Sequence, residues 1–452
     1  MVKKLKIIVV LSIGIFFLGN INIAESLSNK EKIYNNIFIE EIDVSNLKKE
    51  EAKKKVENVI NKSNVLNLEY EGKIYTLNLK EIGIVYYIDK SVEEAYNITR
   101  NKDKISNIKS KIDLKLGNKR IINLEYTYDD NKIDDYIKYI RSELNRESID
   151  ATIKVENKIL TYTKEEYGIK IDDKKLREGI LKNLKERDKL AIDIPVIEIK
   201  PVYLYEDLNK IDTILGTYET YFNSNTANRV NNIKIAAHAT NDIIMKPYDE
   251  FSFNYYINHK DKREKFKKAP VIVNGKLEEG LGGGICQVSS TIYNAALYSG
   301  LEIISVRNHS IPSAYVSKGR DATVTKGNID LKFRNNYKMP VFIHNEVYKD
   351  KIVSTIYGNK ENKKEIEVVT EIMKSIPNKT KVEYSDKLYK GEHEISQKGR
   401  RGYKVNTFRV YNENGQSKKE FIGESYYPPI DEVITYGTKK RIVPEHIKTE
   451  VV

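Results

Sequence analysis

A single cysteine, Cys286, is present in this chain of 452 residues, and its scarcity excludes several kinds of structure. One thiol forms no internal disulfide, and no cysteine near the N-terminus can carry a lipid anchor. His, Cys, Asp and Glu do not cluster at metal-ligand spacing in the sequence, so neither a metal nor another cofactor is expected. Chemistry, rather than cross-linking, is therefore the expected purpose of this thiol.

Long apolar runs are lacking after the first segment of the chain. Lys3, Lys4 and Lys6 precede an apolar stretch at residues 7–19, a pattern typical of an export signal. A membrane-spanning helix needs roughly 20 apolar residues, and this stretch is shorter. Residues 1–25 are therefore either a cleaved signal peptide or a retained signal anchor. A poor cleavage site favours the anchor. We expect an extracytoplasmic protein, anchored in the membrane through this segment or associated with the cell wall.

A long basic block is also absent, although 77 Lys and Arg outnumber 65 Asp and Glu and give a formal net charge of +12. A diffuse excess of this kind is usually a solvated surface, and it would attract anionic wall polymers or lipid headgroups at long range. No basic and aromatic recognition pattern appears, so nucleic acid is not an expected partner of this exported chain.

An internal repeat indicates the organisation of the N-terminal half. The string IYTLNLKEIGIVYYIDKSVEEAYNI, which begins at Ile74, is similar to ILTYTKEEYGIKIDDKKLREGI, which begins at Ile159. Gly83 and Gly168 hold equivalent places, and an acidic residue then leads into an amphipathic helix in each copy. The pattern predicts two copies of one small α+β domain, with binding or spacing as their role.

The length of the chain predicts three or four domains by the usual allowance of roughly 100 to 200 residues each. Beyond the repeats, alternation between apolar and polar residues separated by glycines predicts a small all-β module at the C-terminus. The expected fold class is α+β and multidomain: repeats at 26–118 and 119–210, a mixed α/β domain at 215–358 and the β module at 362–440.

The chemistry concentrates in the string GLGGGICQVSSTIYNAALYSGLEI, which begins at Gly280. It predicts a helix whose N-terminus carries Cys286, where unsatisfied N–H groups and the helix dipole favour a thiolate. The preceding glycines leave the amides of Gly283, Gly284 and Ile285 to meet an oxyanion, as acyl transfer requires. A phosphate loop is excluded because the glycine-lysine-serine/threonine ending is missing. The alternative is an inert cysteine that packs as a small hydrophobe.

A nucleophilic cysteine needs a base, and His309 is the predicted one. It follows an expected strand at residues 301–306 and precedes Pro312, so it can face a helix start; His238, His259 and His344 compete for the role. Asp321, Ser310 or a backbone carbonyl could orient its ring. Ser289, on the same helical flank as the cysteine, is a further candidate for orientation or for substrate contact.

Several strings resemble the VanW family of Gram-positive envelope proteins, which is named from vancomycin-resistance clusters. They are FSFN at Phe251, APVIVNG at Ala269, the string around Cys286, and HSIPSAYVSKGRDATV at His309. The N-terminal pair resembles the peptidoglycan-binding domains that accompany such domains. The C-terminal module resembles the G-five domain, an extracellular unit proposed to contact N-acetylglucosamine, through the glycines at 391, 399, 402, 415 and 437.

Members of the VanW family with this architecture have been identified as noncanonical L,D-transpeptidases. The resemblance implies that Cys286 attacks the carbonyl of the third stem-peptide residue and expels the terminal D-alanine as a thioester forms. The amine of a neighbouring stem then takes the acyl group, with His309 moving the protons. The implied partners are peptidoglycan stem peptides and glycan, and carbapenem-type inhibitors would acylate Cys286. The His-Gly and Ser-His-Gly-Cys strings of the usual L,D-transpeptidases are absent here.

Two other functions stay open from the sequence. A cysteine hydrolase of stem peptides would use the same nucleophile and base but pass the acyl group to water. A non-catalytic accessory protein, linked to glycopeptide resistance, would bind the wall through its repeats and β module, with Cys286 as a structural residue.

Overall fold

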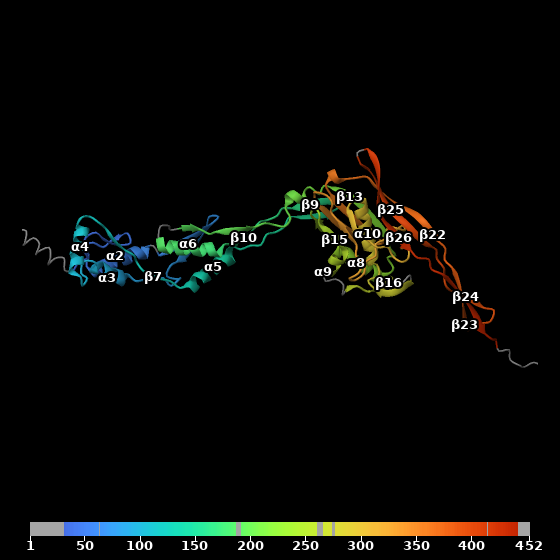
Figure 1. Ribbon diagram of the computed structural model, residues 1–452, viewed down its shortest axis with the longest axis horizontal. Helices are drawn as coiled ribbons and strands as arrows, with labels where there is room; N and C mark the ends of the chain where they lie inside the picture. The colour runs from blue at the N-terminus through green and yellow to red at the C-terminus, as the bar shows by residue number, and fades with distance from the viewer. Residues whose placement is uncertain are drawn as a thin grey trace, which may run out of the picture. The chain divides into compact units, whose positions relative to one another are not determined.

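The computed structural model describes residues 31–62, 64–186, 191–259, 265–273, 276–413 and 415–441. The chain divides into two compact units, Met1–Ser148 with Tyr167–Lys200 and Ile149–Glu166 with Pro201–Val452 (Figure 1). The predicted signal segment, residues 1–25, lies outside the described residues. Within the described part of the chain, no helix has the length and apolar character needed to cross a membrane.

The first unit contains two hydrophobic cores, and the first of them is built from three helices and a small sheet in the order β2-β1-β6. Strand β1 pairs with β6 in parallel and with β2 antiparallel. The elements are β1 (Ile37–Ile39), β2 (Ile42–Asp43), α2 (Lys49–Lys62), α3 (Ile88–Asn97), α4 (Lys104–Lys115) and β6 (Arg120–Ile122).

The second core of this unit joins a hairpin to the two helices that follow later in the chain. Two small sheets, β11-β3-β4 and β10-β12, and a short β5-β7 pair belong to this unit. The elements are β3 (Val65–Tyr70), β4 (Lys73–Asn78), β5 (Val85–Tyr86), β7 (Tyr126–Thr127), α5 (Asp130–Leu144), β10 (Gly168–Ile171), α6 (Asp173–Glu186), β11 (Ala191–Asp193) and β12 (Val196–Ile199).

The repeat is visible in the order of elements, but the cores do not follow the predicted boundary at residue 118. Each copy reads helix, hairpin, short strand and helix: α2-β3-β4-β5-α3 and α5-β8-β9-β10-α6. The β3-β4 hairpin packs on the helices of the second copy, and the β8-β9 hairpin, Thr152–Glu156 and Ile159–Thr163, packs on Phe342 and Tyr357 of the second unit. Each hairpin thus buries its apolar face against residues that come later in the chain.

The second unit is organised around the helix that carries the cysteine. A four-stranded sheet, in the order β13-β21-β20-β14, has helices α8 and α10 against it. Helix α10 (Ile285–Tyr298) is buried on all sides from Gln287 to Leu297, as expected of a helix in the middle of a domain. Around it lie α7 (Tyr205–Leu208), β13 (Thr213–Tyr221), α8 (Ala227–Ala239), β14 (Ile243–Met245), β15 (Glu250–Ser252), α9 (Phe253–His259), β16 (Lys268–Val273), β17 (Lys276–Leu281), β18 (Glu302–Ser305), β19 (Lys332–Arg334), β20 (Val341–Val347) and β21 (Lys351–Gly358).

Apolar residues at Val230, Ile233, Ala236, Ala237 and Ile244 predict a single helix in this region, and its extension to Ile244 is wrong. Helix α8 ends at Ala239, and Thr240 closes it by donating its backbone N–H to the carbonyls of Ala236 and Ala237. Ile244 lies instead in strand β14, where it pairs with Phe342. The strand predicted before His309 does form, as β18 (Glu302–Ser305).

The C-terminal module is all-β, as predicted. Two three-stranded sheets, β22-β25-β26 and β23-β27-β24, succeed each other along it. The first of these sheets belongs to the body that surrounds α10, because Val368 and Ile422 pack against the same hydrophobic core. The strands are β22 (Ile366–Ile376), β23 (Thr380–Tyr389), β24 (His393–Gln397), β25 (Gly402–Glu413), β26 (Gln416–Tyr427) and β27 (Glu432–Lys439).

Candidate active site

The glycine triplet brings the start of α10 against neighbouring backbone. Gly284, the residue before the helix, has a left-handed φ of 111°, which a residue with a side chain adopts only with strain. A Cβ added at Gly283 would lie 2.6 Å from the carbonyl oxygen of Pro270, so strand β16 lies directly against this residue. The glycines are therefore required by geometry, and they fix where the first turn of α10, with Cys286, begins.

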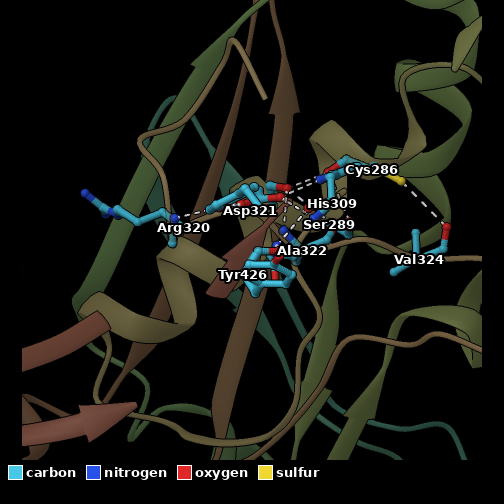
Figure 2. Close-up of polar contacts among 12 residues, drawn as sticks. Cys286, Ser289, His309, Arg320, Asp321, Ala322, Val324 and Tyr426 are labelled. Carbon is cyan, nitrogen blue, oxygen red and sulfur yellow. Dashed lines mark hydrogen bonds and ion pairs between the residues drawn. The ribbon is translucent and has the colours of Figure 1, made fainter. Parts of the chain in front are cut away.

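The thiol of Cys286 lies at the edge of the core rather than deep within it. The residue is partly exposed, and its Sγ donates to the carbonyl oxygen of Val324 over 3.6 Å (Figure 2). The charge of Cys286 also acts on the imidazole of His309, so the two side chains lie near each other. The sulfur is thus not sealed among aliphatic side chains, and it has an imidazole as its neighbour.

His309 is held on its other side by a carboxylate. Its Nδ1 lies 2.6 Å from Oδ2 of Asp321, and the same oxygen accepts the backbone N–H of His309 at 2.7 Å (Figure 2). His309 is 7 % exposed and Asp321 2 %, so the pair is shielded from water. With Nδ1 occupied, Nε2 is the nitrogen left to face the thiol. Cys286, His309 and Asp321 are thus arranged as a nucleophile, its base and an orienting group would need to be.

The pKa of His309 is raised to about 9, although burial alone would lower it. Hydrogen bonds with Asp321 and Cys286 and the charges of both groups outweigh the burial. The imidazole is accordingly protonated at neutral pH.

The polar flank of α10 holds the loop that carries Asp321. Ser289 Oγ donates to the carbonyl oxygen of Ala322 at 2.6 Å, and Ser290 Oγ accepts the N–H of Ala322 at 2.9 Å. Asn294 Nδ2 donates to the carbonyl oxygen of Arg320 at 2.8 Å. Ser289 is fully buried, so its position suits orientation of this loop rather than substrate contact. Ser310 has an exposed side chain, and it is Asp321 that holds the imidazole.

The predicted oxyanion donors lie together before the sulfur, but one of them is already used. The N–H of Ile285 donates to the carbonyl oxygen of Gly282 at 3.1 Å. The amides of Gly283 and Gly284, joined by that of Cys286 itself, are the remaining candidates at this helix start.

The competing histidines lie elsewhere in the second unit. His238 is exposed on α8, and His259 ends α9. His344 lies in β20, where its Nδ1 is 2.7 Å from Oδ1 of Asp242. Within the described ranges, no group of three or more His, Cys, Asp or Glu residues could hold a metal ion.

Arg229 is a site residue that the sequence reading missed. It lies in the first turn of α8, and its Nη2 donates to Oε1 of Gln287 at 2.8 Å. Burial lowers its pKa, against the opposing charges of Tyr315 and Cys286. Among the described residues no carboxylate forms an ion pair with it. A half-buried guanidinium with no carboxylate partner among the described residues is chemically suited to bind an anion.

Three family models match the chain. They are “Putative peptidoglycan binding domain” over residues 75–193, “VanW like protein” over 228–357 and “G5 domain” over 364–439. The first match crosses residue 118, as does the second hydrophobic core of the first unit. Peptidoglycan-binding and G5 domains on either side of a VanW domain define a cell-wall-associated protein.

Two relatives show which family the chain belongs to. The uncharacterized protein YoaR of Bacillus subtilis is 35% identical over 232 residues, which are 51% of this chain and 76% of that protein. The chain belongs to the VanW family, as its motifs predicted. The vancomycin B-type resistance protein VanW of Enterococcus faecalis is 34% identical over 139 residues, 30% of this chain and 50% of that protein. Among solved structures, the G5 domain of IgA1 protease is 25% identical, covers 18% of this chain and 100% of that chain, and has a TM-score of 0.14.

Proposed function

We propose that this protein is an L,D-transpeptidase that cross-links peptidoglycan stem peptides through a thioester on Cys286. One observation carries the proposal: the only thiol of the chain lies at a helix N-terminus beside an imidazole whose Nδ1 is 2.6 Å from a buried carboxylate. This arrangement is the nucleophile, base and orienting group of acyl transfer. The peptidoglycan-binding and G5 domains on either side support the cell wall as the place where the enzyme acts.

The reaction has two halves. The Cys286 thiolate attacks the carbonyl carbon of the third stem residue, and the oxyanion meets the amides before α10. The carbon–nitrogen bond to the terminal D-alanine breaks as the His309 imidazolium gives its proton to the leaving amine, and a thioester remains. An acceptor amine then attacks the thioester and yields a proton to His309. The carbon–sulfur bond breaks, a new amide forms, and the thiolate is restored.

Arg229 fits this substrate class because the leaving residue carries a free carboxylate. The guanidinium interacts with the charge of Cys286, so an anion that it binds lies close to the scissile bond. Gln287, the acceptor of the Arg229 Nη2 hydrogen, is itself fixed by its Nε2, which donates to the carbonyl oxygen of Tyr221 at 2.9 Å. The cation is therefore pre-positioned, and it would select donors that end in a free D-residue.

The direct test incubates the purified protein with disaccharide-tetrapeptide and separates the products by mass. Tetrapeptide donors are expected to give dimers joined between third-position residues, with one D-alanine released for each link. Monomeric tripeptide as the sole product would identify a hydrolase that passes the acyl group to water. Tight wall binding without any turnover would identify a non-catalytic accessory protein.

Arg229→Gln is expected to raise the KM for the tetrapeptide donor by about ten- to a hundredfold, since a charge-assisted hydrogen bond to the terminal carboxylate is lost. The measurement compares donors that end in a free carboxylate with donors that end in a carboxamide. Wild-type protein should discriminate between the two donors, and the variant should not. Arg334→Gln removes a guanidinium that pairs with Glu250 and Glu302 on the surface, and it serves as the control. Equal discrimination in both variants would contradict the assignment.

A further inference from the structure

The first sheet of the C-terminal module contacts the loop that carries Asp321. The Oγ1 of Thr407, in β25, donates to the carbonyl oxygen of Gly319 at 2.8 Å. The N–H of Gly319 in turn donates to the hydroxyl of Tyr427, the last residue of β26, at 2.8 Å. Arg409 Nη1 donates to the carbonyl oxygen of Leu301 at 2.6 Å, just before strand β18. The module is thus joined to both segments that flank the catalytic histidine.

Gly319 permits this close approach. Its φ is +86°, and a Cβ added there would lie 2.7 Å from Oγ1 of Thr407 and 3.1 Å from Cγ1 of Val405. Any side chain at this position would be strained in its backbone and would push β25 away from the loop. The loop and the sheet are therefore fitted to each other at a point two residues from Asp321.

Tyr427 reaches the triad itself. Its ring is fully buried, and its hydroxyl donates to Oδ1 of Asp321 at 2.5 Å. The other oxygen of the same carboxylate, Oδ2, takes the backbone N–H and the Nδ1 of His309. Both oxygens of Asp321 are consequently occupied, one by the C-terminal module and one by the base.

The Tyr427 hydroxyl is suited to act as a permanent donor. Burial, followed by the charge of Asp321 and the hydrogen bond to it, raises the pKa of Tyr427 well above its ordinary value. The phenol therefore keeps its proton near neutral pH. The hydroxyl oxygen accepts the N–H of Gly319, and the hydroxyl proton is donated to Oδ1 of Asp321.

We propose that Tyr427 is a positioning residue of the active site, so that the C-terminal β module completes the catalytic machinery in addition to any role in wall binding. The inference rests on the proposed function, because its catalytic consequence is felt through His309. A carboxylate held at one oxygen can turn about its Cβ–Cγ bond, whereas one held at both oxygens keeps Oδ2 aimed at Nδ1. Tyr427 thereby fixes the ring of the base through a residue that it touches directly.

The test compares two variants that each remove one hydroxyl from the same sheet. Tyr427→Phe removes the donor to Asp321, and Thr407→Val removes a hydrogen bond to Gly319 that does not touch the carboxylate. Tyr427→Phe is expected to lower kcat for cross-linking by about tenfold with an unchanged KM, whereas Thr407→Val keeps kcat. Thermal melting of both variants controls for loss of fold, since a structural role alone predicts similar losses in the two.

A second readout separates the inference from the proposed function. A carboxylate with one donor fewer holds the imidazolium proton more tightly, so the NMR titration of the His309 ring should move to higher pH in Tyr427→Phe. Thr407→Val should leave that titration in place. If the wild-type protein turns over no substrate, the proposed function fails while this titration still tests the coupling. An unchanged titration in Tyr427→Phe, or equal kinetic losses in both variants, would overturn the inference.

Discussion

Cys286→Ala is expected to form dimers from disaccharide-tetrapeptide at least about 10⁴-fold more slowly than the wild-type chain, because no other side chain of the site can form the acyl-enzyme. The chain has no second thiol to substitute for it. Cys286→Ser puts a hydroxyl of similar size in place of the thiol, but a hydroxyl is far less ionised than a thiol near neutral pH, so this variant should be nearly as inactive. The measurement is the initial rate of dimer formation at equal protein concentration.

The single cysteine allows a chemical control for this variant. Iodoacetamide should add one group to the wild-type protein and abolish cross-linking to the same extent as Cys286→Ala. A carbapenem, whose strained carbonyl resembles the acyl donor, should likewise add one drug mass to wild-type protein and none to Cys286→Ala. Cross-linking by a fully alkylated protein, or by the alanine variant, would show that the thiol is not the nucleophile.

Local patterns predicted the positions of Cys286 and His309 in the fold, because each position depends on the residues next to it in the sequence. A glycine triplet before an amphipathic run predicts a helix start, and the structure places Cys286 in the first turn of α10. A strand followed by an irregular segment predicts a loop base, and His309 follows β18. The choice of Asp321 over Ser310 was beyond the sequence, since the direction of that loop is set by its contacts with Ser289 and Ser290 on α10.

The residues that the sequence missed act across long separations. The hydrogen bond between Tyr427 and Asp321 joins residues 106 positions apart in the sequence, and that between Arg229 and Gln287 joins residues 58 positions apart. No periodicity links such pairs, because each is created by how a sheet or a helix packs on α10. The same limit applies to the N-terminal repeats. Similarity between copies gave the order of their elements, but the burial of each hairpin against the next body follows from tertiary packing alone.

Asp321→Asn is expected to lower the rate of cross-linking by about 10²- to 10⁴-fold and to change its dependence on pH. The carboxylate stabilises the imidazolium, and together with Cys286 it raises the pKa of His309 to about 9 against the effect of burial. With the charge removed, burial prevails and the pKa falls. The descending limb of the pH–rate profile, which lies near 9 where His309 loses the proton for the leaving amine, should therefore move to lower pH.

The control for this variant is a second histidine–aspartate pair that lies away from the thiol. His344 and Asp242 form an Nδ1–carboxylate pair at 2.7 Å in the second unit, so Asp242→Asn removes a similar interaction and should keep both the rate of cross-linking and the position of the descending limb.

The stability of the folded protein gives a measurement that needs no turnover. The folded pKa of His309 lies above its unfolded value. The stability that protonated His309 adds to the folded state is therefore complete below a pH of about 6.5, and it disappears as the pH rises through about 9. Wild-type melting temperature should fall across that interval and that of Asp321→Asn should not. A limb that stays near 9 in Asp321→Asn would show that His309 is not the group that titrates.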